Sequence, residues 1–262
     1  APPLRRWLAH GVPAGRVTGG TALLRGPLAD FPFPQRTGRF EVRFGVEDAI
    51  VDYRPGWPRV EEATAELQFV DNRLEFVAES GRILDSTARG VRGSIPQLNP
   101  TQPLRLQGTV DGPAGDLLRL LRESPLQRRY ADAVAAMALR GDSQLALDLT
   151  IPLVRRGDYA LDGEITLRDA ELDLRGPDLT LDALRGTLRL DLEGITAKRL
   201  DAELDGRPLQ LALARPADGG LQINAELRAD RELLLTRYPA LAALRPRGST
   251  ALHVGLHLPR LE

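Results

Sequence analysis

The sequence predicts a mainly β protein, in which most of the chain forms one long antiparallel meander. The main observation is an alternation of apolar and polar residues over residues 145–227, which is typical of strands with one apolar and one hydrated face. Turn signals such as Asp205-Gly206 recur between these strands, and the connections are too short for the crossovers that parallel strands need. Short amphipathic helices are expected near residues 113–140 and 230–245.

The strands expected before residue 112 are short and joined by tight turns. They cover residues 38–46, 49–53, 60–70, 73–79 and 103–111. Asp71-Asn72 fits a hairpin turn between two of them, and Pro55-Gly56 marks another turn. Every Phe and both Trp lie before residue 80, so these large aromatic residues are confined to this part of the chain.

Residues 112–141 break the period of two and are expected to form two short helices. Ser124 precedes Pro125, which fits a helix N-cap followed by Pro at the first helical position. The second helix is expected to extend to Leu139, because Gly141 is a suitable stop.

The Leu-rich meander is expected to follow this helical segment and to end in a helix and a strand. Asp230 can cap a helix over residues 231–244, although Pro239 bends or splits it. Residues 248–258 alternate again and are expected to form the last strand.

The candidate functional residues are the apolar positions of the alternating stretch, because a one-faced sheet must bury its apolar face against something. They are Leu145, Leu147, Leu149, Leu161, Ile165, Leu167, Leu172, Leu174, Leu188, Leu190, Leu192, Leu200, Leu204, Leu209, Leu211, Leu213, Ile223 and Leu227. This face can be the packed core of a closed sandwich or barrel, or the lining of an open trough. Repeated Leu, Ile and Ala with almost no aromatic residues suit a uniform lining better than an interlocked core, but the residues alone leave both roles open.

The domain organisation is expected to comprise an aromatic-containing β segment (residues 1–111), a helical insert (112–141) and the Leu-rich meander with its late helix (142–262). The three parts are expected to form one continuous module. The chain begins at Ala1 without Met, so we expect it to be a segment excised from a longer protein. It holds no apolar run of about 18 residues, the length that spans a bilayer as a helix.

Composition excludes several classes of function. The 35 basic and 36 acidic residues nearly cancel, which argues against a nucleic-acid partner, because such a surface needs a net basic face. Cysteine is absent, so the chain holds no disulfide, no thiolate metal site and no cysteine nucleophile. Hydrophobic residues make up 42% of the chain, which argues against disorder.

Two clusters were weighed as metal sites, and neither is favoured. His253 and His257 lie in an expected strand, where residues four apart are about 13 Å from one another and cannot share an ion. Asp169, Glu171 and Asp173 form an acidic row without the glycine-containing loop of an EF-hand, so a solvated face is favoured over calcium. No metal and no cofactor are expected.

Enzyme motifs are also missing. The sequence has no Gly-rich phosphate loop, no Gly-x-Ser-x-Gly elbow and no His-Glu-x-x-His motif, and no catalytic residue is expected. A hydrolase with convergent carboxylates stays open as a class, because carboxylates distant in sequence can meet in space.

Motifs spread in colinear order over most of the chain resemble the YhdP-type proteins of Gram-negative envelopes, in the AsmA-like superfamily. The motifs are Arg25-Gly26-Pro27-Leu28, Asp30-Phe31-Pro32-Phe33, Gly38-Arg39-Phe40, residues 53–58 (YRPGWP), Ser94-Ile95-Pro96, Ser124-Pro125-Leu126, residues 147–153 (LDLTIPL), Gly163-Glu164-Ile165-Thr166, Leu184-Arg185-Gly186-Thr187-Leu188, Gly194-Ile195-Thr196-Ala197-Lys198 and Gly206-Arg207-Pro208. Each motif is weak alone, and their shared order carries the resemblance.

The resemblance implies a parent protein anchored in the inner membrane by an N-terminal helix, with a long periplasmic body similar to bridge-like lipid-transfer proteins. That body is a curled, taco-like β-groove with an apolar inside, which conducts phospholipids between the inner and outer membranes. The implied partners are phospholipid acyl chains, the two membranes through the missing parts of the parent, and other envelope proteins. The alternative is a non-catalytic envelope scaffold with a closed β core.

Overall fold

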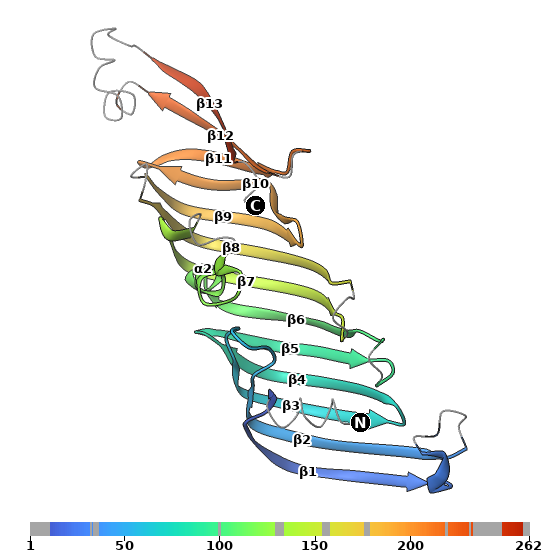
Figure 1. Ribbon diagram of the computed structural model, residues 1–262. Helices are drawn as coiled ribbons and strands as arrows, with labels where there is room; N and C mark the ends of the chain where they lie inside the picture. Colours follow the sequence, from blue (N-terminus) through green and yellow to red (C-terminus); the bar gives the residue numbers. More distant parts are fainter. Residues whose placement is uncertain are drawn as a thin grey trace. The chain divides into compact units, whose positions relative to one another are not determined.

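The predicted mainly β fold is confirmed in the computed structural model of the chain (Figure 1). The structure describes residues 11–31, 33, 37–98, 101–128, 134–153, 158–175, 179–217, 220–230, 232 and 248–258. In these residues thirteen strands form one sheet in which the order of strands is their order in the chain. The two edges, β1 and β13, are not paired with each other, so the sheet is open rather than closed into a barrel.

The strands are long, and short connections join most of them. Their bounds are β1 (Ala14–Arg25), β2 (Arg39–Val51), β3 (Val60–Val70), β4 (Arg73–Ile83), β5 (Ser86–Ile95), β6 (Leu104–Pro113), β7 (Met137–Ile151), β8 (Ala160–Leu174), β9 (Leu179–Asp191), β10 (Gly194–Leu204), β11 (Arg207–Ala214), β12 (Leu221–Asp230) and β13 (Ser249–Leu258). A 3-10 turn, η1 (Leu28–Asp30), and a helix, α2 (Gly115–Arg122), complete the described elements.

The chain divides into two compact units. The first unit holds β1 to β6, residues 123–125, and residues 144–163 of β7, β8 and their connection. The second unit holds α2, the start of β7, the rest of β8, and β9 to β13.

Most of the predicted strands are confirmed, and two strands were missed. The expected strand at residues 60–70 coincides with β3, and Asp71-Asn72 forms the turn to β4 as predicted. The sequence did not indicate β1 or β5. β1 is exposed along its whole length. It buries no face, and its sequence shows no alternation of apolar and polar residues.

Bulges interrupt several strands and move the apolar residues between odd and even positions. Asp48, Glu62, Asp169 and Ala183 lie inside β2, β3, β8 and β9 with φ between 50° and 55°. In β8 the buried residues are odd-numbered up to Leu167, and Ala170 follows the bulge with 0% of its surface exposed. The bulge keeps the apolar side chains on one face, and it also bends the strand.

The helical predictions have mixed outcomes. α2 confirms the first of the two helices expected near residues 113–140. The second helix was expected to continue to Leu139, which is wrong, because β7 starts at Met137. In β7 the carbonyl of Gly141 accepts a hydrogen bond of 2.8 Å from Ala114, which fixes the start of the strand beside the entry to α2.

The helix expected over residues 231–244 lies outside the described residues, apart from residue 232. Among the described helices, none combines the length and the apolar character needed to cross a membrane.

Candidate functional site

The register of β9 to β13 lines up apolar residues in rows across the second unit. The rows are Leu190 with Ile195; Ala197 with Leu213, Ile223 and Leu256; Leu200 with Leu211, Ala225 and Val254; and Ala202 with Leu209, Leu227 and Leu252. Residues directly opposite one another in an antiparallel pair point to the same face, so these rows make one continuous apolar face, which we call the Leu face.

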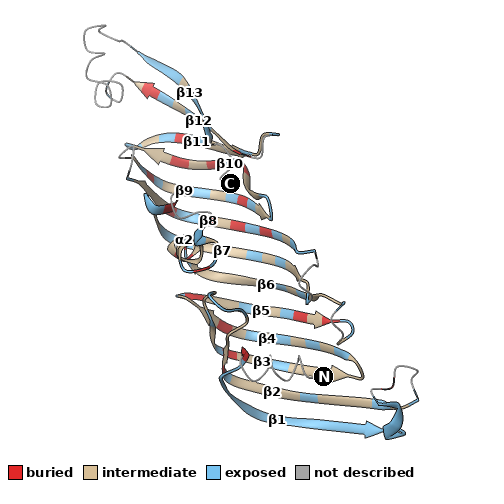
Figure 2. Cartoon of the chain, in the orientation of Figure 1, coloured by how far each residue is buried: buried red, intermediate tan, exposed pale blue. Residues whose placement is uncertain are grey.

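The Leu face is only partly shielded from solvent. Leu200 and Leu209 each expose 4% of their surface, whereas Val254 exposes 55% and Leu256 50%. Figure 2 shows the buried positions scattered along the strands between intermediate and exposed ones. Every described strand belongs to the same sheet, so no second sheet in the described residues packs on this face.

The predicted residues are distributed over both units. Those placed on the Leu face by register or strand spacing are Leu188, Leu190, Leu200, Leu204, Leu209, Leu211, Leu213, Ile223 and Leu227. Those on the second unit's part of β8 are Ile165, Leu167, Leu172 and Leu174. Those in the first unit are Leu145, Leu147, Leu149 and Leu161. Leu192 lies in the turn between β9 and β10 with 53% of its surface exposed, apart from the strand rows.

A second apolar face, which the sequence analysis did not nominate, lies on β2 to β6 of the first unit. Its rows are Val42 with Phe69, Leu74 and Ile95; Phe44 with Leu67, Phe76, Gly93 and Leu106; Val46 with Ala65, Ala78 and Val91; Gly81 with Ala88 and Val110; and Val51 with Val60 and Ile83. We call it the Phe face. The alternation of Phe40, Val42 and Phe44 in the sequence was a usable signal for it.

Aromatic rings on the Phe face lie against small residues. A Cβ built on Gly93 would stand 2.1 Å from Cζ of Phe76, so the ring covers the glycine directly. Phe44 and Phe69 stack with 6.3 Å between ring centroids and 9° between ring planes. The aromatic surface is therefore continuous across neighbouring strands.

The connection between β2 and β3, residues 52–59, carries two further aromatic residues, and we call it the aromatic loop. The rings of Tyr53 and Trp57 lie 6.5 Å apart, and the backbone N–H of Trp57 donates to the carbonyl of Arg54 at 3.2 Å. Burial, followed by the charge of Asp52, raises the pKa of Tyr53 to about 12, so its phenol stays protonated at neutral pH. Tyr53 follows Val51 at strand spacing, which places it on the side of the Phe face.

The aromatic loop also reaches the opposite end of the strands. In an antiparallel meander, the β2–β3 and β7–β8 connections leave the sheet at opposite ends. Nevertheless, Cζ of Arg54 lies 6.0 Å from the ring centroid of Tyr159, which immediately precedes β8. The sheet of the first unit is thus curled enough for one loop to meet both strand ends, and we call the gap between these ends the mouth of the first unit.

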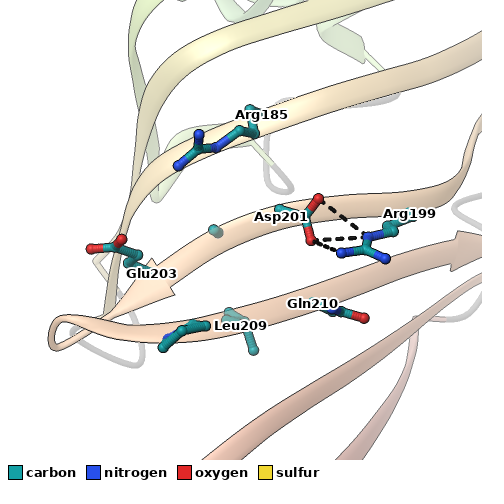
Figure 3. Close-up of a pocket in the computed structure, with 8 residues that line it drawn as sticks. Arg185, Arg199, Asp201, Glu203, Leu209 and Gln210 are labelled. Atoms are coloured by element: carbon teal, nitrogen blue, oxygen red, sulfur yellow. Dashed lines mark hydrogen bonds and ion pairs between the residues drawn. The ribbon is translucent and has the colours of Figure 1, made fainter.

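The hydrated face of β9 to β11 has a hollow of about 350 Å³ (Figure 3). Its lining residues are Arg185, Arg199, Asp201, Ala202, Glu203, Pro208, Leu209 and Gln210. Asp201 is engaged by Arg199, with 2.8 Å between Nη2 and Oδ1. The hollow lies on the side of the polar residues, and none of the predicted residues except Leu209 contributes to it.

Ion pairs fasten neighbouring hairpins at the ends of the strands. Arg207 holds Asp230 in a two-pronged contact, with 3.0 Å from Nε to Oδ2 and 2.9 Å from Nη2 to Oδ1. Nη2 of Arg215 donates to Oδ2 of Asp191 at 2.7 Å, which links the end of β11 to the β9–β10 turn. The hydrogen bond from Arg215 lowers the pKa of Asp191, and backbone N–H groups of the turn add to the effect.

The residues weighed as metal ligands lie in ordinary strand environments. The strand expected over residues 248–258 is confirmed as β13. Nε2 of His253 lies 3.8 Å from Oε1 of Glu226 on β12. In the acidic row, Glu171 and Asp173 both form ion pairs with Arg140, whose Nη1 lies 2.8 Å from Oδ2 of Asp173. The acidic row therefore connects β8 to β7.

Comparison with known proteins adds a family assignment to this geometry. The family model described as "YhdP protein" matches residues 1–261. The chain is 25% identical over 206 residues to the "Intermembrane phospholipid transporter YhdP" of Escherichia coli (strain K12). That match covers 78% of the chain but only 16% of the relative's length. No solved structure matches the chain.

Proposed function

Because the chain belongs to the YhdP protein family, we propose that it is a segment of a periplasmic bridge that conducts phospholipids between the inner and outer membranes. The relative from Escherichia coli is named as an intermembrane phospholipid transporter, and the chain spans 16% of its length. An anchor in the inner membrane and contacts with other envelope proteins belong, in this proposal, to the remainder of the parent protein.

The observation that supports the proposal best is the pair of apolar faces on a single-layered sheet, neither of which has a second described sheet packed against it. In each unit, the register places apolar residues side by side on successive strands. In a sandwich such faces would be covered by a second sheet, but the described strands form only one. We propose that lipid acyl chains provide the missing cover.

Simple energetics favour an apolar path over a crossing through water. Each lipid CH2 kept away from water is worth about 0.8 kcal/mol, and a phospholipid carries tens of them. A row of Leu or Phe side chains offers dispersion contacts, which have no preferred direction and therefore allow an acyl chain to slide. The transfer changes no covalent bond, so the proposal requires neither a catalytic residue nor a cofactor.

The scaffold alternative depends on a closed β core. The described sheet has two free edges, β1 and β13, and it is not closed. The lipid-conducting role is therefore the proposal that the geometry supports best.

Native mass spectrometry of the delipidated and the as-purified chain tests the proposal. We expect the as-purified chain to carry phospholipid, and the delipidated chain to take it up from detergent micelles. A charge in the path should abolish this uptake, so Leu211→Asp is expected to reduce bound lipid at least about tenfold, since burying an unpaired carboxylate is costly.

Ala212→Asp provides the matched control, because Ala212 is the adjacent residue on the same strand but on the hydrated face, opposite the uncharged Asn224. It introduces the same carboxylate and should leave uptake unchanged. Circular dichroism separates loss of binding from loss of folding. A wild-type chain that neither carries nor takes up phospholipid contradicts the proposed function.

A further inference from the structure

The aromatic loop contains a hydrogen-bond donor that the protein leaves unused. Nε1 of Trp57 is buried and has no hydrogen-bond partner. Among the described residues, it is the single buried side-chain nitrogen or oxygen of this kind. An indole N–H can only donate, so what it lacks is an acceptor oxygen. Buried donors in native proteins are nearly always satisfied, which makes such an exception informative about a ligand.

The same loop holds an arginine without a carboxylate partner. Many arginines of the described residues are engaged in ion pairs, as Arg82 is with Glu61 and Arg207 with Asp230. Arg54 is exposed, and its described contact is the ring of Tyr159, with no carboxylate of the described chain in an ion pair with it. Its guanidinium therefore retains hydrogen-bond donors that are free to meet an anion.

We propose that Arg54 and Trp57 form a phosphate subsite at the mouth of the first unit, which takes the phosphodiester of a phospholipid whose acyl chains lie on the Phe face. In this arrangement the guanidinium binds the anionic oxygens, and the indole N–H donates to another oxygen of the same headgroup. The inference rests on the proposed function and adds to it the place where the headgroup is bound.

The geometry of the loop supports this assignment. Arg54 and Trp57 are three residues apart in one turn, so both donors are carried by the same short segment. The turn lies at the end of the apolar rows, beyond Val51 and Val60, where a lipid on the Phe face must place its polar end. Tyr and Trp side chains favour such boundaries, because they combine an apolar ring with a polar tip.

The test compares two lipids that differ only in the headgroup, which is phosphoglycerol in one and a hydroxyl group in the other. The delipidated chain is offered phosphatidylglycerol or diacylglycerol with identical acyl chains in identical detergent micelles, and bound lipid is counted by native mass spectrometry. The wild-type chain should prefer phosphatidylglycerol about tenfold, the effect of one charge-assisted hydrogen-bonding group. Arg54→Gln and Trp57→Phe should each lower this preference to about threefold or less and leave diacylglycerol uptake unchanged.

Arg59→Gln is the matched control, because it removes the same charge from the same loop. Nε of Arg59 is already engaged by Asp52 at 3.1 Å, so the lipid preference should persist in this variant. Inorganic phosphate at the same concentration should not displace phosphatidylglycerol; displacement would identify a site for free phosphate and overturn the headgroup assignment.

The remaining outcomes separate the subsite from the conducting role. Equal uptake of both lipids by the wild-type chain, or a full preference retained in both loop variants, would overturn the subsite and leave the apolar path intact. Uptake of neither lipid would contradict the proposed function itself.

Discussion

The Phe face and the Leu face are two ways of building an apolar surface on a one-layered sheet. The Phe face combines large rings with small residues, so that Phe76 covers Gly93 in the adjacent strand. The Leu face holds no aromatic ring in its rows and combines Leu with other aliphatic residues, so that Leu211 lies between Leu200 and Ala225. A ring fitted over a glycine tolerates little change in shape, whereas a row of leucines can adjust its rotamers to a moving ligand. The two faces are thus both apolar, but they differ in how readily their side chains adapt to a ligand.

Gly93→Val should have the largest effect on stability, because it directly disrupts the packing of the Phe76 ring over the glycine. The new side chain would occupy the space of the Phe76 ring, whose Cζ would be 2.1 Å from the added Cβ. We expect a loss of about 2–3 kcal/mol in the free energy of unfolding, measured by urea denaturation.

Ala225→Val is the corresponding small-to-large change on the Leu face, where Ala225 lies opposite Leu211 and Val254. These aliphatic neighbours can change rotamers to accommodate the added methyl groups. The cost should stay below about 0.5 kcal/mol. Equal costs for the two substitutions would remove the proposed difference in adaptability between the units.

Truncation within the Leu face should have a smaller, position-dependent effect. Leu209 exposes 4% of its surface, so Leu209→Ala should cost about 2 kcal/mol, the lower end for a buried leucine, because an open face can partly collapse. Leu256 exposes 50%, and Leu256→Ala should cost less than about 0.5 kcal/mol. Thermal unfolding of both variants measures the difference. A similar cost at the two positions would mean that exposure does not govern the energetics of this face.

The smallest expected effect concerns the ion pairs at the strand ends. The folded-state pKa of Asp191 is lowered by Arg215, so its stabilising contribution is present above the unfolded pKa of about 3.9 and is lost as the pH falls through the folded value. Because both side chains remain partly exposed to solvent, the contribution should not exceed about 1 kcal/mol. Urea denaturation of wild type and Asp191→Asn should differ most at neutral pH and converge in acid.

Glu41 gives the comparison in the first unit. Its pKa is also lowered, first by a hydrogen bond from Arg39, but that partner lies two residues away on the same strand. The partner of Glu41 on the neighbouring strand is uncharged: Nε2 of Gln68 on β3 donates to Oε1 of Glu41 at 3.1 Å. Glu41→Gln should therefore leave the pH dependence of unfolding closer to that of wild type than Asp191→Asn does.

The alternation of apolar residues was sufficient to predict the fold class and most of the strands, β1 and β5 excepted. β3 has the predicted bounds, and the leucines of β9 to β12 come together on one face as regular strand spacing requires. The same logic applied to Phe40, Val42 and Phe44 would have added the Phe face to the candidate residues. The Phe face lies on strands before residue 112, outside the longest alternating stretch, to which all the candidate residues belong.

Other features could not be predicted from alternation. In β5, Gly90 has φ 57°, and the bulge there shifts the apolar residues from Ala88 to Val91, which hides the period of two. In β8, Asp169 belongs to the acidic row by sequence, but its backbone forms the bulge. The unused donor of Trp57 depends on contacts around the aromatic loop, and these contacts have no counterpart in a local pattern.

The pairing of every described strand with its neighbours in the chain also has a consequence for how the protein folds. Closing one hairpin brings together residues that are close in sequence, so the entropic cost of each step is small. Growth can then proceed strand by strand in the order of synthesis, without waiting for a distant segment to arrive. A chain built in this way can gain or lose a hairpin during evolution and keep the same assembly rule.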